Sequence, residues 1–325
     1  MHESPNEEPS ERTNYSSAAY PPKPVLLEKS QNALRRSLLS LFFYALLFYF
    51  LFDRNISYIA AILVVIIVHE MGHFLFMKLF NYSNVKIFIV PLLGAFTSGK
   101  KQTVSQWQLS LIILAGPLPG IVIGLVLFWI NLNIHNPTLS LLANSFLIIN
   151  LFNCFPFYPL DGGRLIETLF FRENHVIRLI FGIVSIVALI ILFFVMQSYI
   201  MLFIPALIAL ELINENKNQK IRDYLRLEKI NYYTDYENLP DKDYWLIRDC
   251  LIFSFPKKYA GTQAGRYEYG LSEPIVIQHI NNVIKVNLKI DLKGFKRFMM
   301  LLFYIIVLIG PFVFILLNTN FQKPL

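Results

Sequence analysis

The stretch that decides the fold occupies residues 58–80 and reads YIAAILVVIIVHEMGHFLFMKLF. Its apolar length exceeds the roughly 20 residues with which a helix crosses the hydrocarbon layer of a bilayer. Near its middle stand His69, Glu70 and His73. An ionisable side chain inside a membrane helix costs about 2.5 kcal/mol or more by insertion scales, so such residues tend to mark functional sites. We therefore expect a membrane helix whose polar groups share a partner.

A metal ion is the partner that this spacing favours. Positions i and i+4 lie on one face of a helix, so His69 and His73 can present ring nitrogens to a single ion. Glu70 lies beside the pair, where its carboxylate can take a proton from metal-activated water. Imidazole ligands, a carboxylate as the third ligand and a position open for water together indicate Zn²⁺.

Composition extends the membrane prediction to most of the chain. Of 325 residues, 55% are hydrophobic and only 16% are charged, which is typical of a protein whose solvent is mainly lipid. Besides 58–80, apolar runs lie at 37–52, 106–131, 138–157, 176–197, 199–213 and 298–317. We predict an all-α multi-pass membrane protein with about six to seven transmembrane helices and the lipid bilayer as its main partner.

The net charge of +7 could suggest a nucleic-acid-binding protein, but the positions of the basic residues argue against this. Lys and Arg gather at alternate ends of the apolar runs, on the side that also carries Lys29, Arg35 and Arg36. Basic residues favour the cytoplasmic ends of membrane helices. We therefore predict a cytoplasmic N-terminus and no nucleic-acid partner.

Four regions follow from the change of composition along the chain. Residues 1–36 are predicted to be a disordered cytoplasmic tail and 37–213 the membrane core. Residues 214–296 are predicted to be a small α+β cytoplasmic domain, and 297–325 a C-terminal transmembrane helix with its tail. Alternating apolar residues over 284–292 predict a strand, with Asn281 and Asn282 as a hairpin turn. Cys154 and Cys250 form no disulfide framework.

A third metal ligand must come from outside the first motif, and residues 153–164, which read NCFPFYPLDGGR, offer a candidate. Asp161 stands between prolines and glycines that interrupt an apolar run. The backbone groups freed there must be satisfied by protein or by a water-lined cavity, so Asp161 can turn toward the histidines. The alternative is a loop at the membrane surface in which Asp161 is simply solvated.

The two motifs together resemble the site-2 protease family of intramembrane metalloproteases, peptidase family M50. That family combines HExxH with a later NxxPxxxLDG motif, and the matching residues here are His69, Glu70, His73, Asn153, Pro156, Leu160, Asp161 and Gly162. The resemblance implies that Asp161 is the third zinc ligand. It also implies that Asn153 binds the substrate backbone or stabilises the oxyanion, for which the alternative is a helix-end hydrogen bond.

Two further segments resemble parts of the same family. Residues 115–120, AGPLPG, are similar to its GPxxG segment, and residues 91–99 are similar to its glycine-containing re-entrant loop. We expect the re-entrant stretch, with Gly94 as a substrate-binding residue, to pair with an extended substrate as an added strand.

The resemblance implies an intramembrane zinc metalloendopeptidase of the cell inner (plasma) membrane. Its expected substrates are single-pass membrane proteins, cut in regulated intramembrane proteolysis or as signal-peptide remnants, with a regulatory partner at 214–296. The alternative is a membrane metal-binding or metal-transport protein, which needs the ligands but has no need of Glu70 as a base. A non-catalytic scaffold ranks last, because it has no physical need for four polar groups in lipid.

Overall fold

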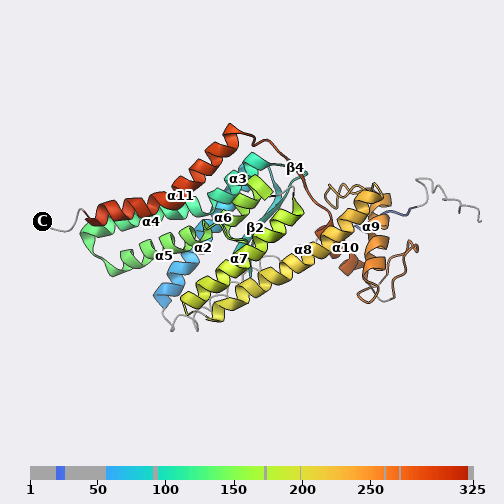
Figure 1. The fold of residues 1–325 in the computed structure, drawn as a ribbon, viewed down its shortest axis with the longest axis horizontal. Coiled ribbons are helices and arrows are strands. Elements are labelled where there is room, and N and C mark those ends of the chain that lie inside the picture. Colours follow the sequence, from blue (N-terminus) through green and yellow to red (C-terminus); the bar gives the residue numbers. More distant parts are fainter. Residues whose placement is uncertain are drawn as a thin grey trace, which may run out of the picture. The chain divides into compact units, whose positions relative to one another are not determined.

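The computed structural model describes residues 20–25, 56–90, 94–171, 174–197, 199–259, 261–270 and 272–320. Contacts within the chain separate two compact units (Figure 1). The first, here called the small unit, combines residues 1–27 with 220–285. The second, here called the membrane unit, combines residues 28–219 with 286–325.

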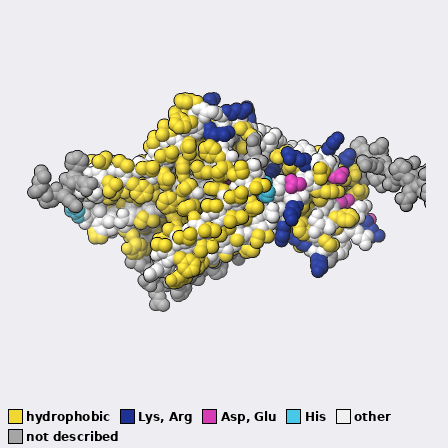
Figure 2. Space-filling model, viewed as in Figure 1, with side chains coloured by type: hydrophobic (Ala, Val, Ile, Leu, Met, Phe, Trp, Pro, Cys, Tyr) yellow, Lys and Arg dark blue, Asp and Glu magenta, His cyan; other side chains and the backbone are white. Residues whose placement is uncertain are grey.

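Four helices in the described part of the chain are long and apolar enough to cross a membrane. They are α2 (Ile56–Leu79), the pair α3 (Gln106–Ala115) and α4 (Pro117–Ile134), α7 (His175–Val195) and α11 (Phe295–Asn320). Their apolar side chains remain exposed in the isolated chain, as with Ile191 on α7 and Ile306 on α11. Figure 2 shows hydrophobic side chains over most of the visible face of the membrane unit. This surface suits contact with lipid.

Two of the predicted spans differ from the helices observed, and a third is not tested by the structure. The run at 138–157 forms α5 (Pro137–Asn153), a shorter apolar helix. The run at 199–213 divides between the 3₁₀ turn η4 (Tyr199–Leu202) and α8 (Phe203–Leu227), whose second half is charged. The run at 37–52 lies outside the described residues. The total of six to seven spans therefore stays a prediction.

The contact between α2 and α3 depends on a glycine. A Cβ added to Gly72 would lie 1.9 Å from the carbonyl oxygen of Ala115, far inside van der Waals contact. The helix that starts at Gln106 breaks at Gly116 because Pro117 cannot donate a backbone hydrogen bond, although it suits the first turn of α4. The break places the α3–α4 junction against α2.

The segment predicted to be a re-entrant loop forms part of a β-hairpin. Strand β1 (Ser83–Val90) pairs antiparallel with β2 (Gly94–Lys100), and Phe88 stacks on Phe96 across the pair at 5.2 Å between ring centroids. The hairpin contacts α2, the helix that carries the histidine motif.

A second two-stranded sheet joins distant parts of the membrane unit. Strand β3 (Thr103–Ser105) pairs in parallel with β4 (Asn287–Lys289). Asp291 then caps α3, accepting from the Ser105 hydroxyl at 2.5 Å and the Trp107 amide at 2.9 Å. A carboxylate is favourable at a helix N-terminus. In the sequence, the short helix α6 (Asp161–Ile166) and the π-helical turn η3 (Glu167–Phe171) lie between β3 and β4.

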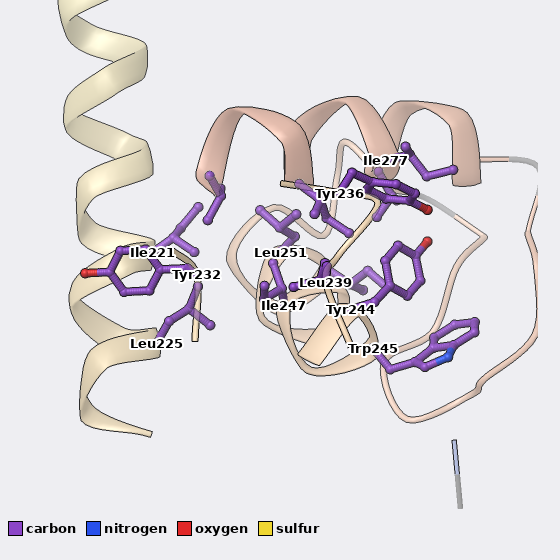
Figure 3. Packing of buried hydrophobic residues seen from close by; sticks show 14 of the residues in the cluster. Ile221, Leu225, Tyr232, Tyr236, Leu239, Tyr244, Trp245, Ile247, Leu251 and Ile277 are labelled. Atoms are coloured by element: carbon purple, nitrogen blue, oxygen red, sulfur yellow. The ribbon is translucent and has the colours of Figure 1, made fainter. Parts of the chain in front are cut away.

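The small unit is helical where the structure describes it, and the strand β4 of the predicted α+β domain at 214–296 belongs to the membrane unit. Its core lies between the end of α8, α9 (Asp241–Ser254) and α10 (Glu273–Val283), as Figure 3 shows. The predicted hairpin turn at Asn281 and Asn282 is wrong, because both residues lie in α10. Burial at Val276, Ile277 and Ile280 follows helical spacing. Of the strand expected over 284–292, the structure forms β4 (Asn287–Lys289).

Candidate metal centre

Two imidazoles from one face of α2 form the first half of the candidate site. His69 and His73 are separated by about one turn and leave the helix on the same side. Both side chains are buried, and their Nε2 atoms lie 3.2 Å apart. The structure thus brings the two predicted nitrogen ligands to one point.

Asp161 reaches the same point from the segment that follows α5. Helix α5 ends at Asn153, and after the proline-rich connection Asp161 begins α6. Its Oδ2 atom lies 3.0 Å from Nε2 of His69 and 3.3 Å from Nε2 of His73. Asp161 is 7% exposed, so the alternative of a solvated loop residue does not hold in this structure.

The hydrogen bonds behind the two rings determine which nitrogen carries the proton. Nδ1 of His73 faces the carbonyl oxygen of Ile112 at 2.8 Å, so it must be the N–H donor. Nδ1 of His69 faces Oδ1 of Asn150 at 2.8 Å, and Nδ2 of Asn150 donates to the carbonyl oxygen of Phe146 at 2.7 Å. That second bond assigns the orientation of the amide, so Nδ1 of His69 is also a donor. Both Nε2 atoms of the neutral rings therefore present lone pairs.

Three acceptor atoms consequently converge without a proton between them. Within the described residues, Oδ2 of Asp161 is buried and has no hydrogen-bond donor. Such a group is costly to bury unless a cation or a donor satisfies it. Among the described residues, these three ligand atoms lie close enough together to hold one metal ion.

The distances suit zinc. Zn–N and Zn–O bonds of about 2.0–2.2 Å in a tetrahedron place neighbouring ligand atoms about 3.3 Å apart. The three separations observed are 3.0, 3.2 and 3.3 Å. Two imidazoles and one carboxylate leave the fourth position of a tetrahedral site open, as a catalytic zinc site requires. The residues present therefore fit the ion that the sequence predicts.

Glu70 lies beside the cluster but is held by a different element. Its Oε2 atom accepts a hydrogen bond of 2.7 Å from the hydroxyl of Thr97 on β2, and the same hydroxyl lies 3.2 Å from the Glu70 carbonyl oxygen. Glu70 is 6% exposed. This carboxylate is positioned by the hairpin rather than by the metal ligands, as a proton-transferring group would be.

Close packing explains the glycines of the 115–120 segment. A Cβ on Gly116 would lie 2.3 Å from Nε2 of His73 and 2.9 Å from Nε2 of His69. A Cβ on Gly120 would lie 2.1 Å from Nδ2 of Asn150. The α3–α4 junction thus lies against both the imidazoles and the amide that orients one of them.

A cavity of about 630 Å³ contains the cluster and Glu70. Asn153 lines it while its amide donates to the carbonyl oxygen of Ile149 at 3.0 Å, so the helix-end hydrogen bond is present together with access to the cavity. Phe96, Thr97 and Arg164 also line the cavity.

Gly94 and three histidines outside the two motifs lie on other elements. Gly94 begins β2, paired with Val90. His135 ends α4, and His175 begins α7 with Nε2 3.2 Å from Oδ1 of Asn216. His279 lies in α10.

Asn150 and Thr97 are the residues that sequence reasoning missed. Asn150 is fully buried in the otherwise apolar helix α5, and a polar residue in such a helix is itself a signal. Thr97 carries no comparable signal, because its role depends on how the hairpin meets α2.

Comparison with known proteins points to a family of metalloproteases. Residues 57–139 match the family described as Peptidase family M50. A zinc metalloprotease of Methanocaldococcus jannaschii is 30% identical over 137 residues, which are 40% of this chain and 36% of that protein. Stage IV sporulation protein FB of Bacillus subtilis is 26% identical over 126 residues, 38% of this chain and 43% of that protein. The matches thus span less than half of each relative.

A solved structure gives a weaker match. The site-2 protease from Methanocaldococcus jannaschii is 21% identical, with a TM-score of 0.41 over 52% of this chain and 84% of that chain. A superposition this loose carries no argument, so the assignment rests on the family match and the named relatives.

Proposed function

We propose that the membrane unit is a zinc-dependent endopeptidase of peptidase family M50 that hydrolyses peptide bonds of membrane-spanning proteins, because residues 57–139 match that family and a zinc metalloprotease is among the relatives. The proposal rests on one observation. Three acceptor atoms, two from α2 and one from Asp161, converge beside the Glu70 carboxylate, which is hydrogen-bonded to Thr97 instead. A binding site alone gives no reason for that fourth group.

The residues divide into ligands and a base. A zinc ion held by His69, His73 and Asp161 would supply a Lewis acid and leave one position open in the cavity. Glu70 accepts a proton from the attacking water and delivers it to the leaving amine nitrogen. The hydroxyl of Thr97 keeps the carboxylate at its place during both transfers.

The hairpin suggests how a substrate is presented. A helical substrate hides its peptide bonds, so it must become extended before a carbonyl can be attacked. In the described residues β2 pairs only with β1, so its other edge can accept an extended segment as an added strand. Gly94 begins this strand and Thr97 lies within it, next to Glu70. Asn153, which also lines the cavity, is proposed to contact the substrate.

Substrates of this class are single-pass membrane proteins, including those cut in regulated intramembrane proteolysis and signal-peptide remnants. The proposed location is the cell inner (plasma) membrane, with the N-terminus in the cytoplasm. Residues 20–25 contact the unit formed by 220–285, as at Lys23 N and Asp241 Oδ1, which are 2.9 Å apart. This contact supports the proposal that both segments lie on the same side of the membrane, as the distribution of basic residues predicts.

A metal-transport or metal-binding protein is the second candidate. The ligand cluster would serve it equally well, so the cluster cannot discriminate between the two functions. Glu70 does discriminate, because a transport site needs ligands but no proton-transferring base.

The test compares wild type with Glu70→Gln, both purified in detergent. Zinc is measured by mass spectrometry, and cleavage is measured on a panel of tagged single-pass membrane proteins. We expect about one zinc per chain in both proteins and a loss of cleavage of about 10²-fold or more in the variant, which is the typical effect of removing a general base.

The ligand variant His73→Ala serves as the control and should lose both zinc and cleavage. Equal cleavage by wild type and Glu70→Gln would contradict the assigned role of Glu70. Zinc binding with no cleavage of any panel member by wild type, combined with zinc uptake into vesicles, would favour transport.

A further inference from the structure

Residues 20–25 of the small unit read Tyr-Pro-Pro-Lys-Pro-Val. Each proline ring fixes φ near −65° and pushes the preceding residue toward an extended conformation, so this composition favours a polyproline II helix. Burial repeats with the three-residue period of that helix: Tyr20, Pro21, Lys23 and Pro24 are half-buried, whereas Pro22 and Val25 are exposed. The segment therefore lies on the small unit along two of its three faces.

The backbone carbonyls of this segment are recognised by aromatic side chains. Proline has no N–H, so an extended proline-rich strand mostly offers acceptors. The hydrogen bonds run from Nε1 of Trp245 to the carbonyl of Pro21 at 2.7 Å, from the hydroxyl of Tyr269 to that of Pro22 at 2.5 Å, and from the hydroxyl of Tyr236 to that of Pro24 at 2.8 Å. All three donors are side chains, so the contact is not an added β-strand.

The rings that supply these donors also form the floor of the contact. Tyr20 packs on Tyr267 with ring centroids 5.0 Å apart, Tyr267 lies 5.5 Å from Trp245, and Trp245 stacks on Tyr269 at 6.0 Å. We call the four residues Tyr236, Trp245, Tyr267 and Tyr269 the aromatic groove. Rows of aromatic rings with hydrogen-bond donors at their edges are the usual receptor for polyproline II segments.

Lys23 adds an electrostatic contact. Its backbone N–H donates to Oδ1 of Asp241 at 2.9 Å, and its ammonium group donates to the carbonyls of Glu237 and Leu239. The ammonium group also lies 5.5 Å from the centroid of the Tyr236 ring. Burial lowers the pKa of Lys23 from its usual value, while Asp241, Asp235 and Glu237 act in the opposite direction. The groove therefore matches a basic residue between prolines.

Residues of the aromatic groove pack against the core of the small unit. Tyr236 and Trp245 are buried at 5% and 0% exposure, and Figure 3 shows both on the side of the cluster away from Ile221 and Leu225 of α8. The guanidinium of Arg248 lies 4.8 Å from the Trp245 ring and pairs with the buried carboxylate of Glu273 at 3.1 Å. Rings held in this way are preorganised for a ligand.

We propose that the small unit is a binding module for extended proline-rich peptides with a basic residue, of the type Pro-Pro-Lys-Pro, and that residues 20–25 occupy its aromatic groove in cis. A proline-rich segment of another protein would bind the same groove by displacing this one. The proposal is independent of the metal centre and of its proposed chemistry.

The cis ligand determines how the test must be designed. A tethered segment competes at an effective concentration of about millimolar, so wild type should bind an added peptide weakly. The probe is a fluorescein-labelled peptide of residues 17–28, SAAYPPKPVLLE. Binding is followed by fluorescence anisotropy with the full chain in detergent. The tail variant combines Pro21→Gly, Pro22→Gly, Lys23→Glu and Pro24→Gly, which should empty the groove without altering it.

We expect the tail variant to bind the peptide about tenfold or more tightly than wild type does. A control peptide in which alanine replaces the three prolines should bind the tail variant about tenfold more weakly, because it lacks the preorganised conformation. Adding Tyr236→Phe and Tyr269→Phe to the tail variant removes two hydroxyl donors and should weaken binding about fivefold or more.

Circular dichroism and elution volume verify that each variant is folded. If the doubly substituted groove is not folded, Tyr269→Phe alone replaces it, since this ring is 59% exposed. Equal binding of the proline and alanine peptides, or no binding by the folded tail variant, would overturn the assignment as a proline-rich peptide site. Equal affinity of wild type and the tail variant would overturn its occupation in cis.

Discussion

At the scale of single residues, Asn150 shows how a group that touches no reacting atom can define a metal site. It accepts from Nδ1 of His69 at 2.8 Å and donates to the carbonyl of Phe146 at 2.7 Å. The first contact selects the ring tautomer, and the second keeps the amide from turning around. Without it, the buried Nδ1–H of His69 would lose its acceptor, and the ring could place the proton on Nε2.

Asn150→Ala is therefore expected to lower zinc affinity about 10- to 100-fold, the usual effect of removing a residue that orients a ligand. The measurement is competition for zinc with a chromophoric chelator. Asn153→Ala is the matched control, since its amide bonds within its own helix, and it should retain wild-type zinc affinity. Equal affinities for the two variants would contradict the role of Asn150.

At the scale of elements, the site depends on how closely the α3–α4 junction approaches α2. Gly116 leaves room for the two imidazoles, and Gly72 leaves room for the carbonyl of Ala115. Close-packed interiors relax only partly when an atom is inserted. The metal ligands on one helix are thus positioned by the backbone of another.

Gly116→Ala should displace the imidazoles, because its Cβ would lie 2.3 Å from Nε2 of His73. We expect bound zinc to fall about tenfold or more. Gly310→Ala in α11 provides the comparison, since its Cβ would come no closer than 3.9 Å to Cγ2 of Ile306. Loss of zinc in both variants would point to general destabilisation instead.

The packing of α10 against the rest of the small unit should depend on pH through His279. Burial and then the charge of Lys258 lower the pKa of His279 to about 4, and the hydroxyl of Tyr259 bonds to its Nδ1. The unfolded chain binds a proton below about pH 6.5. Between about pH 6.5 and 4 the unfolded state therefore binds more protons than the native state, and stability decreases as the pH falls.

We expect the unfolding midpoint of the small unit to decrease from pH 7 to pH 5, and to decrease less in His279→Gln. Trp245 fluorescence during heating reports on this unit when Trp107→Phe and Trp129→Phe are present in both chains. An identical decrease in wild type and His279→Gln would show that other groups cause the acid sensitivity.

At the scale of the whole molecule, the two units have different proposed functions. The membrane unit contains the candidate metal centre, and Figure 2 shows Lys and Arg side chains on the visible faces of both units. The N-terminal segment and residues 220–285 are far apart in sequence yet form one unit. A proline-rich ligand of the small unit would thus compete with a segment that precedes every described membrane helix. This connection gives the expected regulatory partner a specific chemistry.

The sequence by itself determined the features that depend on local spacing and composition. The membrane class follows from long apolar runs, and the pairing of His69 with His73 follows from the period of one helix. The interrupted segment before Asp161 marked it as a candidate, although only the family resemblance assigned it as a ligand. The same local reasoning was wrong at Asn281 and Asn282, because an asparagine pair resembles a turn while the burial of α10 depends on the core it faces.

Only the tertiary structure decided the contacts between distant segments. Thr97 meets Glu70 across 27 residues, Asn150 meets His69 across 81, and Tyr236 meets Pro24 across 212. The parallel pairing of β3 with β4 belongs to the same class. Local periodicity shows which face of an element is apolar, but it does not show which other element will cover that face. That choice depends on close packing and hydrogen-bond satisfaction over the whole fold.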